Sequence, residues 1–336
     1  MTDHPMSGRV VLITGAAGGL GRAHAHAFGA LGAHVVLSDV SDPAVVVAEV
    51  TAAGGSALGV VAGVDTWEGA AVPVAAAVDA FGRLDVLVNN AGIIRDKSFA
   101  KATPEMIEAV LAVHLHGAFH MTKAAWPHLS ERGGSIINTT SGSGLYGNFG
   151  QVNYAAAKAG LVGFTRALAL EGARAGIRVN AIAPLAKSAM TETMMAPELL
   201  ERLAPEWVSP LVTWLASDGC TATGCVYSVG AGRYARVASC VSPSPGKARI
   251  NAFAPRALGA GNPVEQFLRR HAAQRRHRLG HPAGEPARGV EVIGRHPALA
   301  HHGIDLADQA LDADQLFAFG LRQRAALGDL ALDRGA

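Results

Sequence analysis

The chain has 336 residues, a formal net charge of +2 and 49% hydrophobic residues, few of them aromatic. This length fits one large domain or two small ones, and the near-neutral charge gives no case for a nucleic-acid or membrane-surface partner. The 3 cysteines are an odd count without a C-x-x-C pair, which argues against a disulfide framework and a zinc site. No run of about 18 strongly apolar residues occurs, so no transmembrane helix is predicted.

Neither end of the chain carries a recognisable targeting signal. Residues 1–10 lack the apolar core of a secretory signal peptide. The final residues, LDRGA, do not match the peroxisomal tripeptide signal. We therefore expect a cytoplasmic protein.

Short apolar runs alternate with helix-forming segments over most of the chain. Apolar runs stopped by glycine or a polar residue predict buried strands. In chain order, the predicted strands are 9–15, 33–39, 57–65, 84–92, 134–141, 176–184 and 225–232. The predicted helices are 19–32, 43–55, a helix ending at Phe81, one long helix over 103–129 and a helix over 154–174.

This alternation predicts an α/β fold with a doubly wound, mostly parallel, seven-stranded sheet. Helices should cover both faces, as in Rossmann-type proteins. Thr103 is the expected N-cap of the long helix, with Pro104 at its first position. Ligands of such sheets bind beyond the carboxyl ends of the strands.

The pattern stops near Ala238. The remaining residues are rich in Arg, His, Ala and Pro and contain no Tyr or Trp. We expect residues 1–237 to form a nucleotide-binding domain and residues 238–336 a poorly ordered, solvated tail. The Arg-rich segment 269–278 could instead contact nucleic acid or acidic lipid, and a reading-frame error is a third explanation.

A glycine-rich stretch, TGAAGGLG, follows the first predicted strand and opens a helix. Glycines here allow a tight turn and let the backbone approach a pyrophosphate at a helix N-terminus.

Asp39 ends the next strand, where an acidic side chain can bind both ribose hydroxyls of an adenosine and repel the 2′-phosphate of NADP. Asp39 also fits as the cap of the following turn. Asp65 could face the adenine or lie in a surface turn. The cofactor-binding candidates from this region are Thr14, Gly15, Gly19, Leu20, Gly21, Asp39 and Asp65.

Several motifs in a fixed order resemble the short-chain dehydrogenase/reductase family over roughly residues 8–236. They are TGAAGGLG, NNAG at 89–92, Ser141, YAAAK at 154–158 and SVGAG at 228–232. AGIIRDKSF and GNFGQVNY look most similar to the (3R)-hydroxyacyl-CoA dehydrogenase part of the peroxisomal multifunctional enzymes and their bacterial relatives. The resemblance implies NAD as cofactor, a small-molecule substrate such as an acyl-CoA, and a homodimer or homotetramer. It adds Asn90, Ala91 and Gly92 to the cofactor-binding candidates.

Tyr154 and Lys158 lie four residues apart and so share one helix face. An ammonium beside a phenol favours the phenolate and lowers its pKa, which makes tyrosine a usable acid/base. By resemblance, Lys158 also binds the nicotinamide ribose, and Ser141 holds the substrate oxygen. Without the other motifs, Tyr154 would be explained by packing and Lys158 as a solvated helix residue.

The chain departs from the family pattern at two places. The resemblance places His114 where most members have an asparagine that supports a water and a proton path from the lysine. His114 is therefore a fourth catalytic candidate beside Ser141, Tyr154 and Lys158, as a trait of the subgroup; the alternative is a packed helix histidine. Leu185 replaces a glycine, and Ser188 is the candidate for the lost carboxamide contact. Residues 190–203 are the expected lid, whose methionines would suit an acyl chain or ordinary packing. His116 and His120 are spaced for a metal, but no third ligand is in view and no metal is expected.

The leading hypothesis is an oxidoreductase that passes a hydride between NAD and a secondary alcohol, most specifically a (3R)-3-hydroxyacyl-CoA. One alternative is a dehydrogenase for a steroid or another secondary alcohol. A different class is a non-catalytic nucleotide-binding protein. The complete set of Ser141, Tyr154 and Lys158 favours an enzyme, because a binding module needs none of the three together.

Overall fold

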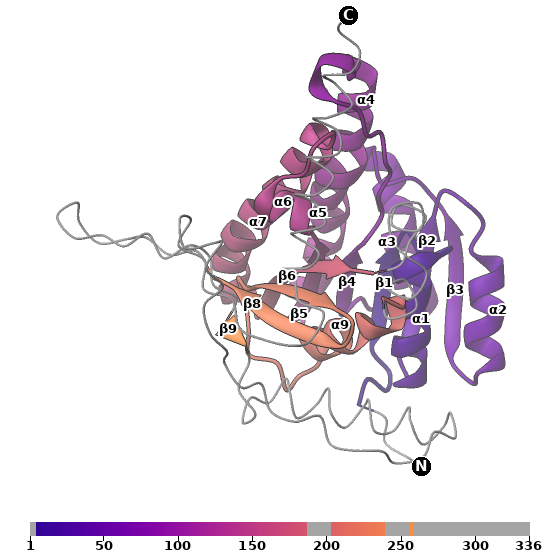
Figure 1. Ribbon diagram of the computed structural model, residues 1–336. Coiled ribbons are helices and arrows are strands. Elements are labelled where there is room, and N and C mark those ends of the chain that lie inside the picture. Colours follow the sequence, from indigo (N-terminus) through magenta and orange to yellow (C-terminus); the bar gives the residue numbers. More distant parts are fainter. Residues whose placement is uncertain (1–4, 187–202, 239–255, 258–336) are drawn as a thin grey trace, which may run out of the picture. The chain divides into compact units, whose positions relative to one another are not determined.

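One sheet organises the protein in the computed structural model, which describes residues 5–186, 203–238 and 256–257 (Figure 1). The described residues form one compact unit. Their strand order is β3-β2-β1-β4-β5-β6-β7-β8-β9. The strands are β1 (Val10–Thr14), β2 (His34–Asp39), β3 (Ser56–Val61), β4 (Val86–Asn89), β5 (Gly134–Thr139), β6 (Ile177–Leu185), β7 (Val226–Gly230), β8 (Arg233–Val237) and β9 (Arg256–Ala257).

The seven predicted strands are confirmed as β1 to β7, and all pairings among these seven are parallel. β1 lies between β2 and β4, so the direction of winding reverses there. In open α/β sheets a crevice for ligands forms beyond the carboxyl ends of the strands at such a switch point. The predicted site motifs follow β1, β4 and β5, on this same edge.

Two antiparallel strands, β8 and β9, were not predicted and extend the sheet beyond seven. A two-residue turn joins β7 to β8, with Ala231 at φ 48° and Gly232 at φ 74°. Positive φ at both positions is typical of the hairpin turn that matches strand twist. Alanine rarely adopts this conformation, which is why the turn was missed. β9 falls inside the predicted tail; apart from Ala238 and β9, that tail lies outside the described residues.

Helices cover both faces of the sheet (Figure 1). Along β1, Val11 and Ile13 pack beneath α1, α2 and α9, whereas Val10 and Leu12 pack beneath α3 and α5. Alternating side chains thus bury both faces, as expected for a parallel sheet. The helices are α1 (Gly19–Ala30), α2 (Ala44–Ala52), α3 (Trp67–Phe81), α4 (Pro104–Leu111), α5 (Gly117–Ser130), α6 (Gly142–Tyr146), α7 (Val152–Gly172) and α9 (Ser209–Ala216). None of the described helices is both long enough and apolar enough to cross a membrane.

The predicted single helix over 103–129 is wrong in one respect, because a π-helical turn at Ala112–His116 separates α4 from α5. The predicted cap is confirmed: the Thr103 hydroxyl accepts a hydrogen bond from the Met106 N–H at 3.4 Å, and Pro104 begins the helix. A π-turn inserts an extra residue into a helix and occurs frequently at functional sites. Here it contains His114.

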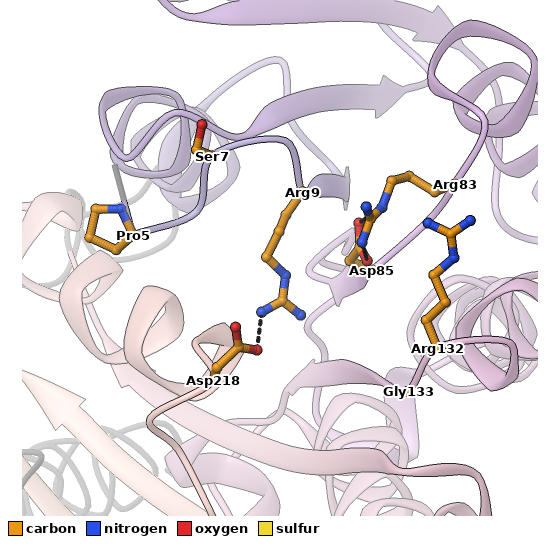
Figure 2. Close-up of a pocket in the computed structure, with 8 residues that line it drawn as sticks. All are labelled: Pro5, Ser7, Arg9, Arg83, Asp85, Arg132, Gly133 and Asp218. Carbon is orange, nitrogen blue, oxygen red and sulfur yellow. Dashed lines mark hydrogen bonds and ion pairs between the residues drawn. The ribbon is translucent and has the colours of Figure 1, made fainter. Parts of the chain in front are cut away.

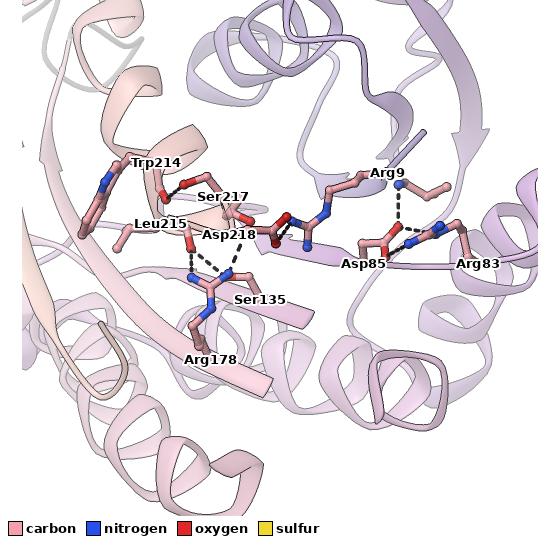
Figure 3. A network of polar contacts seen from close by, with 11 residues as sticks. Arg9, Arg83, Asp85, Ser135, Arg178, Trp214, Leu215, Ser217 and Asp218 are labelled. Carbon is pink, nitrogen blue, oxygen red and sulfur yellow. Dashed lines mark hydrogen bonds and ion pairs between the residues drawn. The ribbon is translucent and has the colours of Figure 1, made fainter. Parts of the chain in front are cut away.

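The amino edge of the sheet carries a charged network (Figure 3). Asp85, just before β4, is 3% exposed and accepts hydrogen bonds from Val10 N (2.8 Å), Arg83 Nε (2.8 Å) and Arg83 Nη2 (2.6 Å). Arg9 Nη1 donates to Asp218 Oδ1 at 2.5 Å. Together these contacts join the starts of β1 and β4 to the end of α9. A cavity of about 450 Å³ opens beside them, and Arg132 also lines it (Figure 2).

Candidate active site

The loops that follow β1 and β4 are tied together at the switch point. The buried Thr14 hydroxyl oxygen accepts hydrogen bonds from the N–H groups of Asn90 and Ala91, both at 3.0 Å. In return, Asn90 Nδ2 donates to Thr14 O at 2.9 Å and to Gly15 O at 3.1 Å. The structure therefore brings the predicted TGAAGGLG and NNAG motifs into direct contact.

Two glycines of the first loop have no room for a side chain. Gly15 has φ +66°, and a Cβ there would lie 2.8 Å from the Cα of Ala91. A Cβ on Gly21 would lie 2.2 Å from the carbonyl oxygen of Gly15. Leu20 packs against the core beneath α1 and fixes that helix behind the loop.

The amino end of α1 has the form of an anion cradle. Its N-cap residue, Gly18, provides no side-chain cap, and the first turn contains no acidic residue. A Cβ on Gly19 would meet nothing within 4 Å, so the space before the helix is open. Backbone N–H groups at such a helix end bind phosphate groups well. The loop therefore fits a dinucleotide pyrophosphate.

Asp39 closes β2 next to this cradle. Its Oδ2 accepts a hydrogen bond from Ala17 N and its Oδ1 accepts one from Ser41 N, each at 3.0 Å. The carboxylate thus both touches the glycine loop and caps the following turn. The prediction that Asp65 ends the third strand is wrong, because β3 ends at Val61. Asp65 is an exposed residue in the segment between β3 and α3.

Ser141, Tyr154 and Lys158 come together beyond the carboxyl end of β5. Ser141 follows that strand, while Tyr154 and Lys158 lie one turn apart near the start of α7. Tyr154 is 8% exposed and Lys158 is 3% exposed. Lys158 Nζ lies 5.7 Å from the centroid of the Tyr154 ring and donates a hydrogen bond to Thr139 O at 2.5 Å. The predicted triad is one cluster in space.

The charge states of this cluster differ from the sequence-based expectation. Burial raises the pKa of Tyr154; a hydrogen bond with Ser141 lowers it and the negative charge of Asp96 raises it again. Burial lowers the pKa of Lys158 to about 7. The pKa of Tyr154 therefore lies above its ordinary value, whereas the sequence predicted a lowered one, because desolvation of the phenolate is the largest effect.

His114 belongs to the same cluster. It is 5% exposed, and its ring stands edge-on to that of Tyr154 with centroids 5.1 Å apart. Its Nε2 lies 2.7 Å from Ile93 O and 3.0 Å from Ile93 N. Burial and then the charge of Lys158 lower the pKa of His114 to about 3, so the ring is neutral near pH 7. A Cβ on Gly92 would lie 2.3 Å from His114 Cε1, which explains that glycine.

A small internal cavity of about 10 Å³ lies between β4 and α7. Thr14, Asn89, His114 and Lys158 contribute its polar lining. This volume is about enough for one water molecule. Asn89 Oδ1 and His114 Nδ1 are buried without a hydrogen-bond partner among the described residues. The cavity therefore suits a single bridging water beneath Lys158.

The predicted metal-like spacing of His116 and His120 has another explanation. His120 Nδ1 lies 2.9 Å from Val64 O, and its ring packs against Trp67 with centroids 4.1 Å apart. Within the described ranges, no group of three or more His, Cys, Asp or Glu side chains is placed to hold a metal ion. His120 thus joins α5 to the segment before α3.

One set of polar contacts beside the cluster was not predicted. Gln151 Nε2 donates to Asp96 Oδ2 at 2.6 Å, and the Ser143 hydroxyl donates to Gln151 Oε1 at 2.7 Å. Asp96 lies in AGIIRDKSF and Gln151 in GNFGQVNY, two segments that marked the family resemblance without a role for either residue. The available signal was the position of these polar residues, Asp96 just after NNAG and Gln151 just before YAAAK. Ser188 and residues 190–202 of the predicted lid lie outside the described residues.

Comparisons with known proteins agree with this geometry. A family model described as short chain dehydrogenase matches residues 9–203. Peroxisomal multifunctional enzyme type 2 of Mus musculus is 48% identical over 237 residues, which cover 67% of this chain and 32% of that protein. A hydroxyacyl-CoA dehydrogenase of Mycobacterium tuberculosis is 40% identical over 233 residues, covering 63% of this chain and 74% of that protein.

Among solved structures, a short chain dehydrogenase from Mycobacterium avium has 46% sequence identity and a TM-score of 0.66. The match covers 72% of this chain and 89% of that one. The chain spans about a third of the mouse multifunctional enzyme, so that protein's other parts have no counterpart in the match. The chain belongs to the short-chain dehydrogenase family, oxidoreductases that act on CH–OH groups with a nicotinamide dinucleotide.

Proposed function

We propose that the protein is an NAD-dependent dehydrogenase of (3R)-3-hydroxyacyl-CoA thioesters. The observation that carries the proposal is the cluster of Ser141, Tyr154 and Lys158 beside the glycine cradle at the switch point. The thioester substrate rests on the hydroxyacyl-CoA dehydrogenase of M. tuberculosis, of which the chain covers 74%.

Each side chain of the cluster has a defined task in this reaction. A nicotinamide dinucleotide, when bound, supplies the hydride acceptor. Ser141 Oγ donates a hydrogen bond to the substrate oxygen and orients it. Tyr154 Oη takes the hydroxyl proton as the alcohol becomes a ketone. Burial raises the pKa of Tyr154 and lowers the pKa of Lys158, so it disfavours both the phenolate and the ammonium.

The preference for NAD over NADP rests on the charges beside the cradle. Asp39 presents a carboxylate where the adenosine ribose is expected. Arg22, on the first turns of α1, is held by Glu49 through bonds of 2.7 Å and 2.5 Å. An arginine already paired in this way is a poor partner for a 2′-phosphate, and a nearby carboxylate repels one.

Three further expectations stay predictions: a homodimer or homotetramer, a cytoplasmic location, and the absence of a catalytic role for residues 238–336. The peroxisomal names among the relatives leave the location open between two compartments. A steroid or another secondary alcohol is the competing substrate class.

The deciding experiment follows NADH formation from NAD⁺ with matched (3R)- and (3S)-3-hydroxyacyl-CoA. We expect turnover of the (3R) form, with the (3S) form slower by about 10²-fold because a chiral pocket aligns only one hydrogen with the acceptor. A steroid alcohol is assayed in parallel. Faster turnover of the steroid, or equal rates for both enantiomers, would replace the thioester proposal with the alternative.

A further inference from the structure

The loop after β4 is fastened to the start of α7 at successive residues. Asn153 Nδ2 donates a hydrogen bond to Arg95 O at 3.1 Å. The backbone N–H of Lys97 donates to Gly150 O at 2.9 Å. Asp96, between them, accepts from Gln151. The loop therefore moves with the amino end of the helix that carries Tyr154.

Gln151 is the centre of this attachment. It is 4% exposed, and its amide reaches three separate segments. Its Nε2 donates to Asp96 Oδ2 at 2.6 Å, while its Oε1 accepts from Ser143 Oγ at 2.7 Å and Asn148 Nδ2 at 3.0 Å. A buried amide with this set of partners has one orientation, because turning it over would leave donors facing donors.

This network reaches both residues that flank the substrate oxygen. The backbone N–H of Ser143 donates to Ser141 Oγ at 3.2 Å. Gln151 is the N-cap residue of α7, and Tyr154 lies in the first turn of that helix. Displacing Gln151 therefore shifts Ser141 through Ser143, and shifts Tyr154 through the first turn of α7.

Asp96 has a buried carboxylate of which only one oxygen is known to be hydrogen-bonded. Its Oδ1 is buried and has no hydrogen-bond partner among the described residues. Leaving a buried carboxylate oxygen unpaired is unfavourable, so a neutral side chain would suffice for packing alone. The short bond to Gln151, a charge-assisted one, gives a reason for the carboxylate.

We propose that Asp96 and Gln151 are positioning residues, which hold Ser141 and Tyr154 at the spacing that the reaction requires. The inference rests on the proposed dehydrogenase activity, because it assigns the two residues to that reaction. Neither residue touches the reacting atoms in the proposal. Both act through Ser143 and through the first turn of α7, and the charge of Asp96 also raises the pKa of Tyr154.

A polarity swap tests the pair. In Gln151→Glu, the introduced carboxylate faces Asp96, so the donor is lost and two negative charges repel. In Asp96→Asn, the new amide oxygen still accepts from Gln151. In the double variant, the amide at position 96 donates to the carboxylate at position 151, whose other oxygen still accepts from Ser143 and Asn148. The double variant also restores the charge of the natural pair.

We expect Gln151→Glu to lower kcat by about 10²-fold, because displacements near 1 Å at a reacting centre have that effect. Asp96→Asn should stay within about 5-fold of the natural enzyme, and the double variant should recover to within about 5-fold, a strongly non-additive result. KM should change much less than kcat. The affinity for NADH should be unchanged in all three variants, since the glycine cradle is not altered.

Two controls separate positioning from general damage. Asp85→Asn changes a buried, hydrogen-bonded carboxylate at the opposite edge of the sheet (Figure 3) and should leave kcat unchanged. Gln151→Met removes the hydrogen bonds without adding charge and should also lower kcat. A normal kcat in both Gln151→Glu and Gln151→Met would overturn the proposal. So would a double variant whose fold loss in kcat equals the product of the losses in the two single variants.

A second measurement does not depend on turnover. Hydrogen exchange of residues 142–154 should rise in Gln151→Glu and return towards the natural rate in the double variant. If the natural protein fails to oxidise the thioester, the substrate proposal fails while this measurement still decides the inference. Unchanged exchange in Gln151→Glu would refute it independently.

Discussion

The two edges of the sheet use polar residues in opposite ways. At the amino edge, both carboxylate oxygens of Asp85 are hydrogen-bonded and Arg9 is paired with Asp218 (Figures 2 and 3). Buried side-chain atoms without a hydrogen-bond partner lie mostly elsewhere. Of the seven such atoms among the described residues, five belong to residues at or beside the carboxyl edge: Ser38, Asn89, Asp96, His114 and Thr139. Of the other two, one belongs to His34 at the amino end of β2 and one to His24 on α1.

This difference locates the site better than cavity size does. The cavity at the amino edge measures about 450 Å³, whereas the one beneath Lys158 measures about 10 Å³. Two of the three arginines that line the large one are paired with aspartates, Arg9 with Asp218 and Arg83 with Asp85. Buried polar atoms without partners are rare in folded proteins and need an explanation such as a ligand or water. Their concentration at the carboxyl edge supports a binding site there.

The largest effect should come from Tyr154→Phe, which tests the carboxyl edge directly. Loss of the transferable proton should lower kcat by about 10² to 10⁴-fold while the affinity for NADH stays the same. Tyr234→Phe is the matched control, since that hydroxyl bonds Trp207 O in another part of the protein. Stopped-flow rates and NADH fluorescence would measure both quantities. A retained kcat would exclude Tyr154 as the acid/base.

The second effect concerns Asp39. We expect the natural protein to favour NAD over NADP in kcat/KM, and Asp39→Ser to reduce that preference by about 10 to 10²-fold by removing the repulsion of a 2′-phosphate. Asp42→Ser is the control, because Asp42 only caps the next helix by accepting from Ala44 N. Equal use of both cofactors by the natural protein would contradict the assignment.

Most of the fold was predictable because the signals were local. Apolar runs such as 10–13 and 86–88 are buried at every residue and show no amphipathic alternation, which is typical of parallel strands. The hairpin to β8 was not predictable, since Ala231 adopts a conformation that its residue type disfavours. The π-turn was missed because the contacts made by its His114, with Ile93 and Tyr154, join residues distant in sequence.

Residue identities in the candidate site were predictable, but their charge states were not. The motif spacing placed Ser141, Tyr154 and Lys158 together. It carried no measure of burial, and burial sets the direction of both pKa shifts. The bond between Asp96 and Gln151 joins residues 55 positions apart, so only the folded chain reveals it.

At the amino edge, Asp85→Asn should lower the free energy of unfolding by about 2 kcal/mol, because three donors lose a buried anionic acceptor. Urea unfolding would measure the loss. Turnover at a temperature where the variant remains folded should be natural. If this variant instead lost activity without losing stability, the division between a structural and a catalytic edge would be wrong.

A smaller, pH-dependent effect is expected at His24. This histidine on α1 is fully buried, and its Nδ1 lies 2.9 Å from Ser209 Oγ on α9. Burial lowers its pKa from 6.5 to about 3. Above 6.5 the ring is neutral whether folded or unfolded, and stability is full. As pH falls from 6.5 towards 3, only the unfolded chain takes up the proton, so stability is lost by about 1.4 kcal/mol for each pH unit.

His24→Gln removes that proton while its side chain can still bond Ser209. Urea unfolding at several pH values between about 7 and 5 should therefore give a shallower pH dependence for the variant, by about one proton. The comparison of slopes cancels the other titrating groups, His114 included. Identical slopes would mean that His24 is accessible to protons in the folded protein.

The smallest effect should follow removal of everything after Ala238, which also tests the proposed boundary between residues 1–237 and 238–336. All proposed cofactor contacts precede this position, so NADH affinity should stay within about 2-fold. The truncation also removes β9, which pairs with β8 at Ala235–Ala257 and Arg236–Arg256. Two residue pairs at a sheet edge contribute about 1 kcal/mol, since each bond there competes with water.

A second truncation after residue 260 keeps β9 and isolates that contribution. Comparable stability of the two, with both folded, would support residues 1–237 as an independent domain. If the shorter chain failed to fold while the longer one did, β9 would belong to the domain and its boundary would move past residue 257.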